Sequence, residues 1–265
     1  MTTGIPWAAA ARRMATPAIV LIIWQASVGA FRFGSGFIPM PSEAVQSLAI
    51  WIFGGATGDR YSGTWVASVE ASFGRVISGF IVASLMGILI GMLIGRSRVL
   101  SDLIDPLVQA LRPIPVSAWV PFSLVFFGIG PGAAIFLVAL GAFFPVVLNT
   151  VSGARQVSVL HLRSSRMLGA GALRSVLLVV IPSASPSILV GLRLAMGLSW
   201  VLLIVAEMVA VKSGLGYELW NAYYYSRMDV IVAAMLTIGV LGFLSDRVIV
   251  MISNYVLRWQ SPEKG

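Results

Sequence analysis

The sequence predicts an all-α membrane protein with about six transmembrane helices. Apolar residues occupy 58% of the 265 positions and charged residues only 11%, whereas soluble domains carry roughly 25% charged residues. Long runs without a charge recur along the chain, and glycine or proline separates several of them. Because a helix needs about 20 mainly apolar residues to cross a bilayer, the chain is long enough for several crossings in one membrane domain.

The first expected span covers residues 14–31, which carry no charge and follow Arg12 and Arg13. Small residues close this run, so a cleaved signal peptide is the alternative, but we favour a retained span. The prolines at 39 and 41 then predict a turn before a short apolar helix that reaches Phe53. We expect that helix to lie along the membrane surface.

Two charge-free runs predict the next three spans. Residues 76–94 form a run of 19 and predict the second span. Residues 113–154 form a run of 42, which as one helix would extend roughly 60 Å, twice the hydrocarbon thickness. This run must therefore fold back, and Gly128, Gly130, Pro131 and Gly132 mark the reversal. The expected third and fourth spans cover about 107–128 and 133–151.

A basic connector follows at 153–184, and positive-inside bias places it in the cytoplasm. Within it, Leu160, Ser164, Met167 and Leu168 share one face of a possible amphipathic helix near 158–169, and the alternative is a loop helix that touches only lipid. Further on, the pattern predicts a fifth span, a re-entrant loop and a sixth span, at about 186–209, 214–216 and 230–252.

The distribution of basic residues predicts the orientation. In a six-span model most of them fall on the side of the 153–184 connector, so both termini are expected in the cytoplasm. The net charge of +8 is scattered between apolar stretches, which favours the lipid bilayer as a partner and argues against nucleic acid.

No catalytic or metal-binding pattern is present in the sequence. There is no cysteine and only one histidine, His161, and neither a catalytic triad nor a phosphate loop can be assembled. We therefore expect no catalytic site, no metal site and no cofactor in this chain. An ion-coupled secondary transporter, a channel and a membrane-embedded enzyme remain alternatives, although no internal repeat or acidic cluster favours them.

Several short motifs resemble the permeases of binding-protein-dependent ABC importers, within the nitrate, sulfonate and taurine branch. They occur in family order over roughly residues 38–259. The stretches are Leu111-Arg112-Pro113-Ile114-Pro115, Ala118-Trp119-Val120-Pro121, Phe127-Gly128-Ile129-Gly130, Gly141-Ala142-Phe143-Phe144-Pro145, Leu168-Gly169-Ala170, Ile181-Pro182, Gly191-Leu192-Arg193, Ala206-Glu207-Met208 and Ser213-Gly214-Leu215-Gly216-Tyr217.

This resemblance implies the fold of a type I (MetI-like) importer and a set of partners. Two ABC ATPase subunits would bind ATP and Mg on the cytoplasmic side, a second permease copy would complete a homodimer, and an extracytoplasmic binding protein would deliver substrate. The expected location is the bacterial cytoplasmic (inner) membrane. The implied solute is a small anion such as a sulfonate, taurine or nitrate, with a weak lean toward aliphatic sulfonates.

With the resemblance, the organisation of the chain is predicted as follows: an N-terminal tail and first span (1–35), an extracytoplasmic segment with the lateral helix (36–64), a permease core (65–259) containing the coupling loop (153–184), and a cytoplasmic tail (260–265).

The resemblance assigns ATPase coupling to the connector helix. The residues are His161, Leu162, Arg163, Ser164, Ser165, Arg166, Leu168, Gly169 and Ala170. One departure stands out, because Arg163-Ser164-Ser165 occupies the place of the family's usual Glu-Ala-Ala. The charge at the first position of the signature is therefore reversed.

Six further residues are candidates for the translocation pathway or its gate, because ionised groups in hydrocarbon are costly and usually serve a function. They are Arg112, Pro113, Pro115, Trp119, Arg193 and Glu207. For Arg112 the alternative is snorkelling toward headgroups, and for Arg193 it is pairing with Asp102 or Asp105. Glu207 is expected to serve a gate or an ion pair.

Small residues recur along one face of the second span, at Gly79, Ala83, Ser84, Gly87 and Gly91. Such a stripe lets two helices approach closely, so we predict helix packing there.

Overall fold

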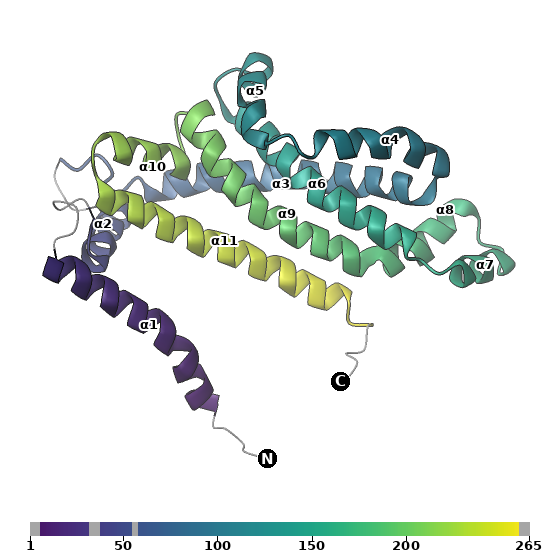
Figure 1. Cartoon of the computed structure of the whole chain (residues 1–265), viewed down its shortest axis with the longest axis horizontal. Coiled ribbons are helices and arrows are strands. Elements are labelled where there is room, and N and C mark those ends of the chain that lie inside the picture. The colour runs from purple at the N-terminus through teal and green to yellow at the C-terminus, as the bar shows by residue number, and fades with distance from the viewer. Residues whose placement is uncertain (1–5, 32–37, 55–57, 260–265) are drawn as a thin grey trace. The chain divides into compact units, whose positions relative to one another are not determined.

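The computed structural model describes residues 6–31, 38–54 and 58–259, and all regular structure within them is helical (Figure 1). The long and medium helices are α1 (Pro6–Phe31), α2 (Pro41–Phe53), α3 (Trp65–Arg96), α4 (Arg98–Leu111), α6 (Pro131–Arg155), α9 (Ile181–Ala210), α10 (Leu215–Tyr224) and α11 (Met228–Val256). Shorter pieces are η2 (Val116–Trp119), α5 (Val120–Phe127), α7 (Val159–Met167), α8 (Ala172–Ser175) and η3 (Val176–Val180).

The chain forms two compact units, one of residues 1–68 with 218–237 and the other of residues 69–217 with 238–265. In the first unit, the backbone N–H of Met40 donates to the Glu43 carboxylate at 2.8 Å, which caps α2 at its start. Trp51 is fully buried, and its indole donates to Thr64 Oγ1 at 3.1 Å. The short helix expected after the proline turn is therefore present, and its placement along the membrane stays a prediction.

In the second unit, α3 and α6 run parallel and in register. Gly79 of α3 meets Val138 of α6, and Gly91 meets Thr150. Both pairs are separated by 59 positions, which only parallel helices allow. A Cβ atom at Gly91 would lie 2.6 Å from that of Thr150, so the small residues bring the two backbones together as predicted.

Because α3 and α6 are parallel, the segment between them must return to the starting side. It does so as a bent pair, α4 followed by η2 and α5, with 93° between the two parts. The third span, expected at about 107–128, therefore corresponds to this bent pair and not to one continuous helix. Pro113 and Pro115 explain the break, since neither has a backbone N–H and each restricts the residue before it.

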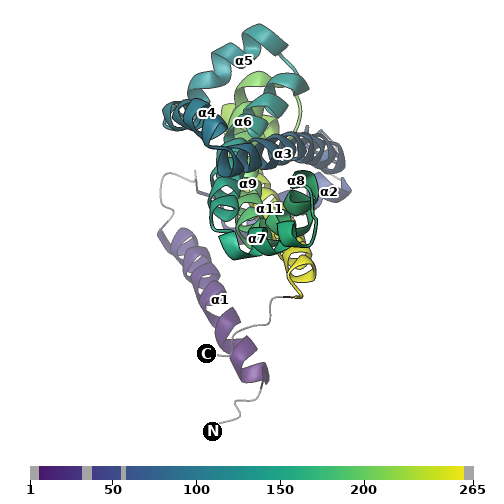
Figure 2. The same cartoon turned by 90° about the vertical axis from the view of Figure 1, so that its right-hand side faces the viewer.

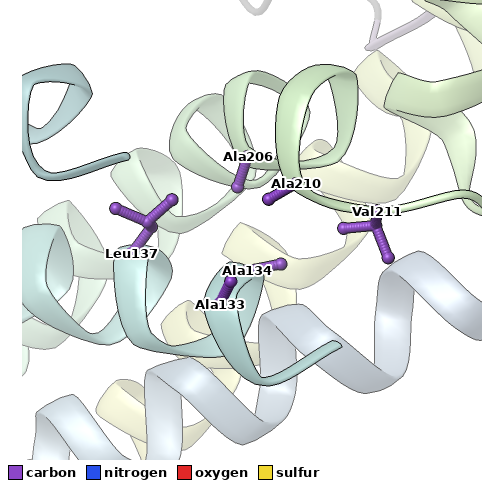
Figure 3. Packing of buried hydrophobic residues seen from close by; sticks show 6 residues of the cluster. All are labelled: Ala133, Ala134, Leu137, Ala206, Ala210 and Val211. Carbon is purple, nitrogen blue, oxygen red and sulfur yellow. The ribbon is translucent and has the colours of Figure 1, made fainter. Parts of the chain in front are cut away.

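The helix α9 packs antiparallel along α6. Gly191 of α9 lies against Asn149 of α6, and Gly153 of α6 lies against Ser187, so positions rise on one helix as they fall on the other. Where α6 begins and α9 ends, buried residues of both helices form a cluster (Figure 3). It consists of Ala133, Ala134, Leu137, Ala206, Ala210 and Val211. Figure 2 shows α3, α6 and α9 close together in this unit.

Four helices within the described residues are long and apolar enough to cross a membrane: Trp65–Arg96, Pro131–Arg155, Ala172–Ala210 and Met228–Val256. The bent pair would make a fifth. The apolar part of α1, Ala15–Ala30, is shorter than these. The all-helical class and five of the expected crossings agree with the structure, and the crossing by α1 stays a prediction.

Candidate functional site

The connector helix α7 presents an apolar face outward. It begins at Val159, after Ser158 accepts the Leu160 N–H in an N-cap hydrogen bond at 3.2 Å. Leu160 is 70% exposed, and Met167 and Leu168 are each 87% exposed. Ser164 lies exposed among them. These four residues, the face predicted from the spacing, are called the α7 face below.

The end of α7 is held by a glycine turn. Gly169 has φ +79°, its N–H donates to Arg166 O, and the Ala170 N–H donates to Ser165 O, both at 3.0 Å. This pair of bonds is a Schellman motif, for which glycine is the favoured residue. Ser165 is buried and its hydroxyl lies 3.1 Å from that of Ser175, which ties the turn to α8.

The remaining predicted coupling residues divide between the two sides of α7. Leu162 packs inward against the buried residues Met92, Ala154, Val157 and Val180. His161, Arg163 and Arg166 are exposed. The chain becomes helical again at Ala172 and continues through η3 into α9. The helical segment that leads into α9 therefore begins inside the stretch 153–184 that was predicted as a connector.

The four pathway candidates at the proline bend lie in different surroundings. Arg112, Pro113 and Pro115 lie exposed between α4 and η2. Trp119 instead packs against the apolar cluster at the junction of α6 and α9, with its ring 5.5 Å from that of Phe122 in an edge-on arrangement. A pathway or gate role for Arg112, Pro113, Pro115 and Trp119 stays a prediction.

Arg193 of α9 pairs with Asp246 of α11. Its Nε lies 2.6 Å from Oδ1 and its Nη2 lies 3.0 Å from Oδ2, a two-bond arrangement. The expected pairing of Arg193 with Asp102 or Asp105 is wrong, because Asp246 takes both of these bonds. Asp105 pairs instead with Arg155 at 3.1 Å. The side chains of Arg193 and Asp246 are 56% and 32% exposed although both lie within long apolar helices.

Glu207 is the centre of a buried polar network. It is fully buried and forms an ion pair at 2.5 Å with Nη1 of Arg75, which is 6% exposed. The Ser72 hydroxyl reaches the carboxylate at 2.8 Å, and the Gly216 N–H donates to it at 2.9 Å. The ion pair expected as one alternative for Glu207 is present, and the gate stays a prediction.

This network also holds the loop that follows α9. Arg75 donates to Ser213 O at 2.8 Å and to Ser213 Oγ at 2.6 Å. The Leu215 N–H donates to Ser72 Oγ at 2.8 Å, so Ser72 and Glu207 satisfy the first amides of α10. Gly214 has φ +107°, and a Cβ there would overlap the Glu207 carboxylate. The chain thus turns back onto α9 where a re-entrant loop was expected.

Arg75 was missed by the sequence reasoning, which started the second span one residue later. A signal was available, because an isolated acid inside an apolar helix requires a cation at the same depth. Arg75 is the charged residue that borders the 76–94 run on its N-terminal side. Sequence alone could not select it over the other arginines, since 132 positions separate it from Glu207.

The first unit has its own ion cluster near the start of α11. Nη2 of Arg227 lies 3.2 Å from Asp59 and 2.8 Å from Asp229. The hydrogen bond to Asp229 is the main reason that the pKa of Arg227 lies above its ordinary value. Nearby, burial raises the pKa of Tyr61 to about 12, assisted by the charge of Glu218.

Long apolar helices, ion pairs within them and a connector helix with an exposed apolar face are together typical of a polytopic membrane protein. Residues 83–258 match the family of the binding-protein-dependent transport system inner membrane component. The chain belongs to this family, whose members are permease components of ABC importers. The predicted family is thereby confirmed.

Relatives cover nearly the whole chain. An ABC transporter permease protein of Methanocaldococcus jannaschii is 39% identical over 95% of this chain and 93% of the relative. The bicarbonate transport system permease of Synechococcus elongatus is 36% identical over 90% and 86%. An aliphatic sulfonates transport permease of Bacillus subtilis is 31% identical over 94% and 87%.

The fold matches a chain of the MetNI methionine ABC transporter in an inward-facing crystal form. The TM-score is 0.64 with 20% identity, and the match covers 72% of this chain and 95% of that chain. At this identity the likeness concerns the fold alone. It confirms the predicted MetI-like class.

Proposed function

We propose that this permease imports a small oxyanion and is driven by ATP that a partner ATPase binds, with Mg, and hydrolyses. The proposed assembly contains two copies of the chain, two ATPase subunits and an extracytoplasmic binding protein, in the cytoplasmic membrane with both termini inside. Under this orientation α7 lies on the cytoplasmic side. No step of ATP chemistry is assigned to residues of this chain.

The observation that supports ATPase docking best is the exposed α7 face. Large apolar side chains on a rigid, capped helix lose contact with water when a partner groove covers them. Leu162 and Ser165 anchor the other side of the same helix to the permease core. A displacement of α7 by the bound ATPase would therefore be transmitted to α9 through α8 and η3, because no long loop separates these elements.

The proposed homodimer is supported by the exposed pair of Arg193 and Asp246. Charged groups within the hydrocarbon cost several kcal/mol unless they face protein or water. A second copy of the chain, with an aqueous pathway between the copies, would provide both. Under this proposal the pair faces the pathway, and alternating access changes its exposure.

An oxyanion is supported by the relatives named for bicarbonate and for aliphatic sulfonates, both of which present negatively charged oxygens. The bicarbonate permease is the more similar of these two, so identity gives no preference for sulfonates. We assign selection among the anions to the binding protein, which is a separate chain.

ATP-dependent uptake into proteoliposomes that contain the chain, its ATPase and its binding protein tests the proposal. Anion uptake should require all three proteins and ATP. The double variant Met167→Asp/Leu168→Asp should lose co-purification with the ATPase and lose uptake. Val99→Asp is the matched control, because Val99 is 68% exposed at the start of α4 and lies outside α7. Uptake by the chain alone, without ATP, would instead favour a secondary transporter or channel.

A further inference from the structure

An apolar groove of about 510 Å³ lies between the last turns of α3 and the segment that leads into α9. One wall is the stretch of α3 from Leu85 to Arg96, and the other is formed by Leu173, Val176 and Ile181. Apart from Arg96 and Ser97, every residue that lines the groove is apolar. Leu85 is 67% exposed and Leu173 is 73% exposed. The groove is therefore an open apolar surface with one polar end.

The length of the groove matches one leaflet of a bilayer. At 1.5 Å per residue, α3 advances about 16 Å from Leu85 to Arg96, and the hydrocarbon of one leaflet is about 15 Å thick, half of the whole core. The helix itself is long and apolar enough to cross a membrane. When Arg96 lies at the level of the headgroups, the apolar part of the groove thus extends along the acyl chains of that leaflet.

The polar end of the groove carries positive charge. Arg96 is exposed and forms no salt bridge within the described residues. The same holds, in that part of the chain, for Arg174, which follows the groove residue Leu173. Arginine binds phosphate oxygens through paired N–H donors, and basic pockets between membrane helices bind the headgroups of anionic lipids. An anionic headgroup therefore complements this end.

We propose that the groove binds one anionic phospholipid, with an acyl chain along α3 and the phosphate at Arg96. The chain would cover the exposed leucines, which a free phosphate ion could not do. A zwitterionic lipid brings its own cation next to the two arginines, so an anionic headgroup is favoured. Under the proposed orientation this end of α3 lies in the cytoplasmic leaflet, whose surface is negatively charged.

The groove also adjoins the joint between α7 and α9. Val176 begins η3, a π-helical turn, and turns of this rare kind are frequent at functional sites. Met92 lines the groove and belongs to the buried cluster against which Leu162 of α7 packs. The bound lipid would therefore contact side chains that anchor α7. Its effect on the coupling between ATP hydrolysis and uptake rests on the proposed function.

Photolabelling tests the site on the full-length chain in vesicles of phosphatidylcholine. The probe is a trace of phosphatidylglycerol with a photoreactive diazirine on one acyl chain, and the readout is the label on peptides that contain residues 85–96 and 173–181. Excess phosphatidylglycerol should remove this label. Arg96→Gln should lower it about fivefold, the effect of roughly 1 kcal/mol for one basic residue near a membrane surface. Arg96→Lys, which keeps the charge, should stay within about twofold of the original chain.

Two matched controls accompany these variants. Arg258→Gln removes an exposed charge on the same expected side of the membrane that does not line the groove. Leu89→Trp should fill the groove and lower the label, whereas Leu236→Trp, at an exposed position of α11 outside the groove, should not. Equal labelling of Arg96→Gln and the original chain would overturn the proposal. So would an equal loss in Arg258→Gln, or no label on these peptides, which would mean that protein covers the groove.

ATP-driven uptake by the full complex separates the lipid site from the importer. Phosphatidylglycerol added to the phosphatidylcholine vesicles should raise uptake about fivefold, the lower end of the usual coupling between two sites, and Leu89→Trp should show no such rise. Labelling with equal uptake in both membranes would overturn the effect on coupling and leave the site. Labelling with no uptake in either membrane would refute the importer alone.

Discussion

Arg193 and Asp246 form a two-bond ion pair between α9 and α11 while both side chains remain partly exposed. The pair lies far from either end of α9, which runs from Ile181 to Ala210. Exposure at that depth requires water or a second protein surface beside the pair. The exposed side of the pair is therefore where we expect the pathway between two copies of the chain.

Exchanging the charges of Arg193 and Asp246 tests whether the two residues act as a pair. Either Arg193→Asp or Asp246→Arg alone should lower ATP-driven uptake about tenfold or more, because each leaves two like charges side by side within the membrane. The double exchange should recover a large part of the uptake. Recovery assigns a pairing role to Arg193, whereas a double variant as inactive as the single ones would mean that the guanidinium contacts the transported anion.

The buried pair of Arg75 and Glu207 should be a major source of stability for the loop after α9. Removing one partner of a buried ion pair costs about 3–5 kcal/mol, because the other charge remains unpaired. We expect Glu207→Gln and Arg75→Gln to lose about that much in the free energy of unfolding, measured by titration with a denaturing detergent. The double variant Arg75→Met/Glu207→Met should lose less than the sum.

Ser72→Ala measures the contribution of hydrogen bonding to this network without removing a charge. Ser72 bonds the same carboxylate and the Leu215 amide but carries no charge. Its removal should cost only about 1–3 kcal/mol. If the loss in Ser72→Ala equals that in Glu207→Gln, the network would depend on hydrogen bonding and not on the paired charges.

The parallel contact of α3 and α6 predicts opposite effects at two glycines of one helix. Gly91→Ala should destabilise the protein by about 1–3 kcal/mol, because the new Cβ would press on Thr150. Gly74→Ala should stabilise it by up to about 1 kcal/mol, since nothing lies within 4 Å and alanine favours the helix. Thermal melting of the two purified variants decides this, and equal shifts would contradict the packing.

How far sequence reasoning reached depended on whether a feature was local. The apolar runs, the reversal near Gly130 and the face of α7 each follow from residues close in sequence, and the structure shows all three. The third span was expected at about 107–128, where the bent pair lies, but the 93° angle between its two parts was not foreseen. A pattern records that proline interrupts a helix, whereas the angle depends on the helices packed around it.

The partners in the ion pairs could not be identified from the sequence. Asp246 lies 53 positions from Arg193, and Arg75 lies 132 positions from Glu207. Once α9 is placed antiparallel to α6 and beside α11, these partners fall at the same depth. Before that placement, Asp102 and Asp105 were equally reasonable partners for Arg193. Pairing between distant helices is a property of the packing, and only the need for some partner can be inferred beforehand.

Burial of Glu218 in α10 predicts a dependence of stability on pH. Burial raises the pKa of its carboxyl above the ordinary value of 4.5. Below pH 4.5 the folded and unfolded chains are both protonated, so the shift contributes nothing. As the pH rises from 4.5 through the folded pKa, the unfolded chain releases a proton that the folded chain still holds. Stability therefore falls across this window and then stays at the lower level.

Glu218→Gln removes this titration while it keeps the size of the side chain. The variant and the original chain should have similar stability near pH 4, and the variant should become the more stable one as the pH is raised to 8. The measurement is the difference between their melting temperatures at each pH. Tyr61, whose pKa is raised to about 12, and Arg227, whose pKa is also raised, keep their protons throughout this range. A difference that stays constant from pH 4 to 8 would show that the Glu218 carboxyl is solvated in the folded protein and that α10 packs more loosely than described.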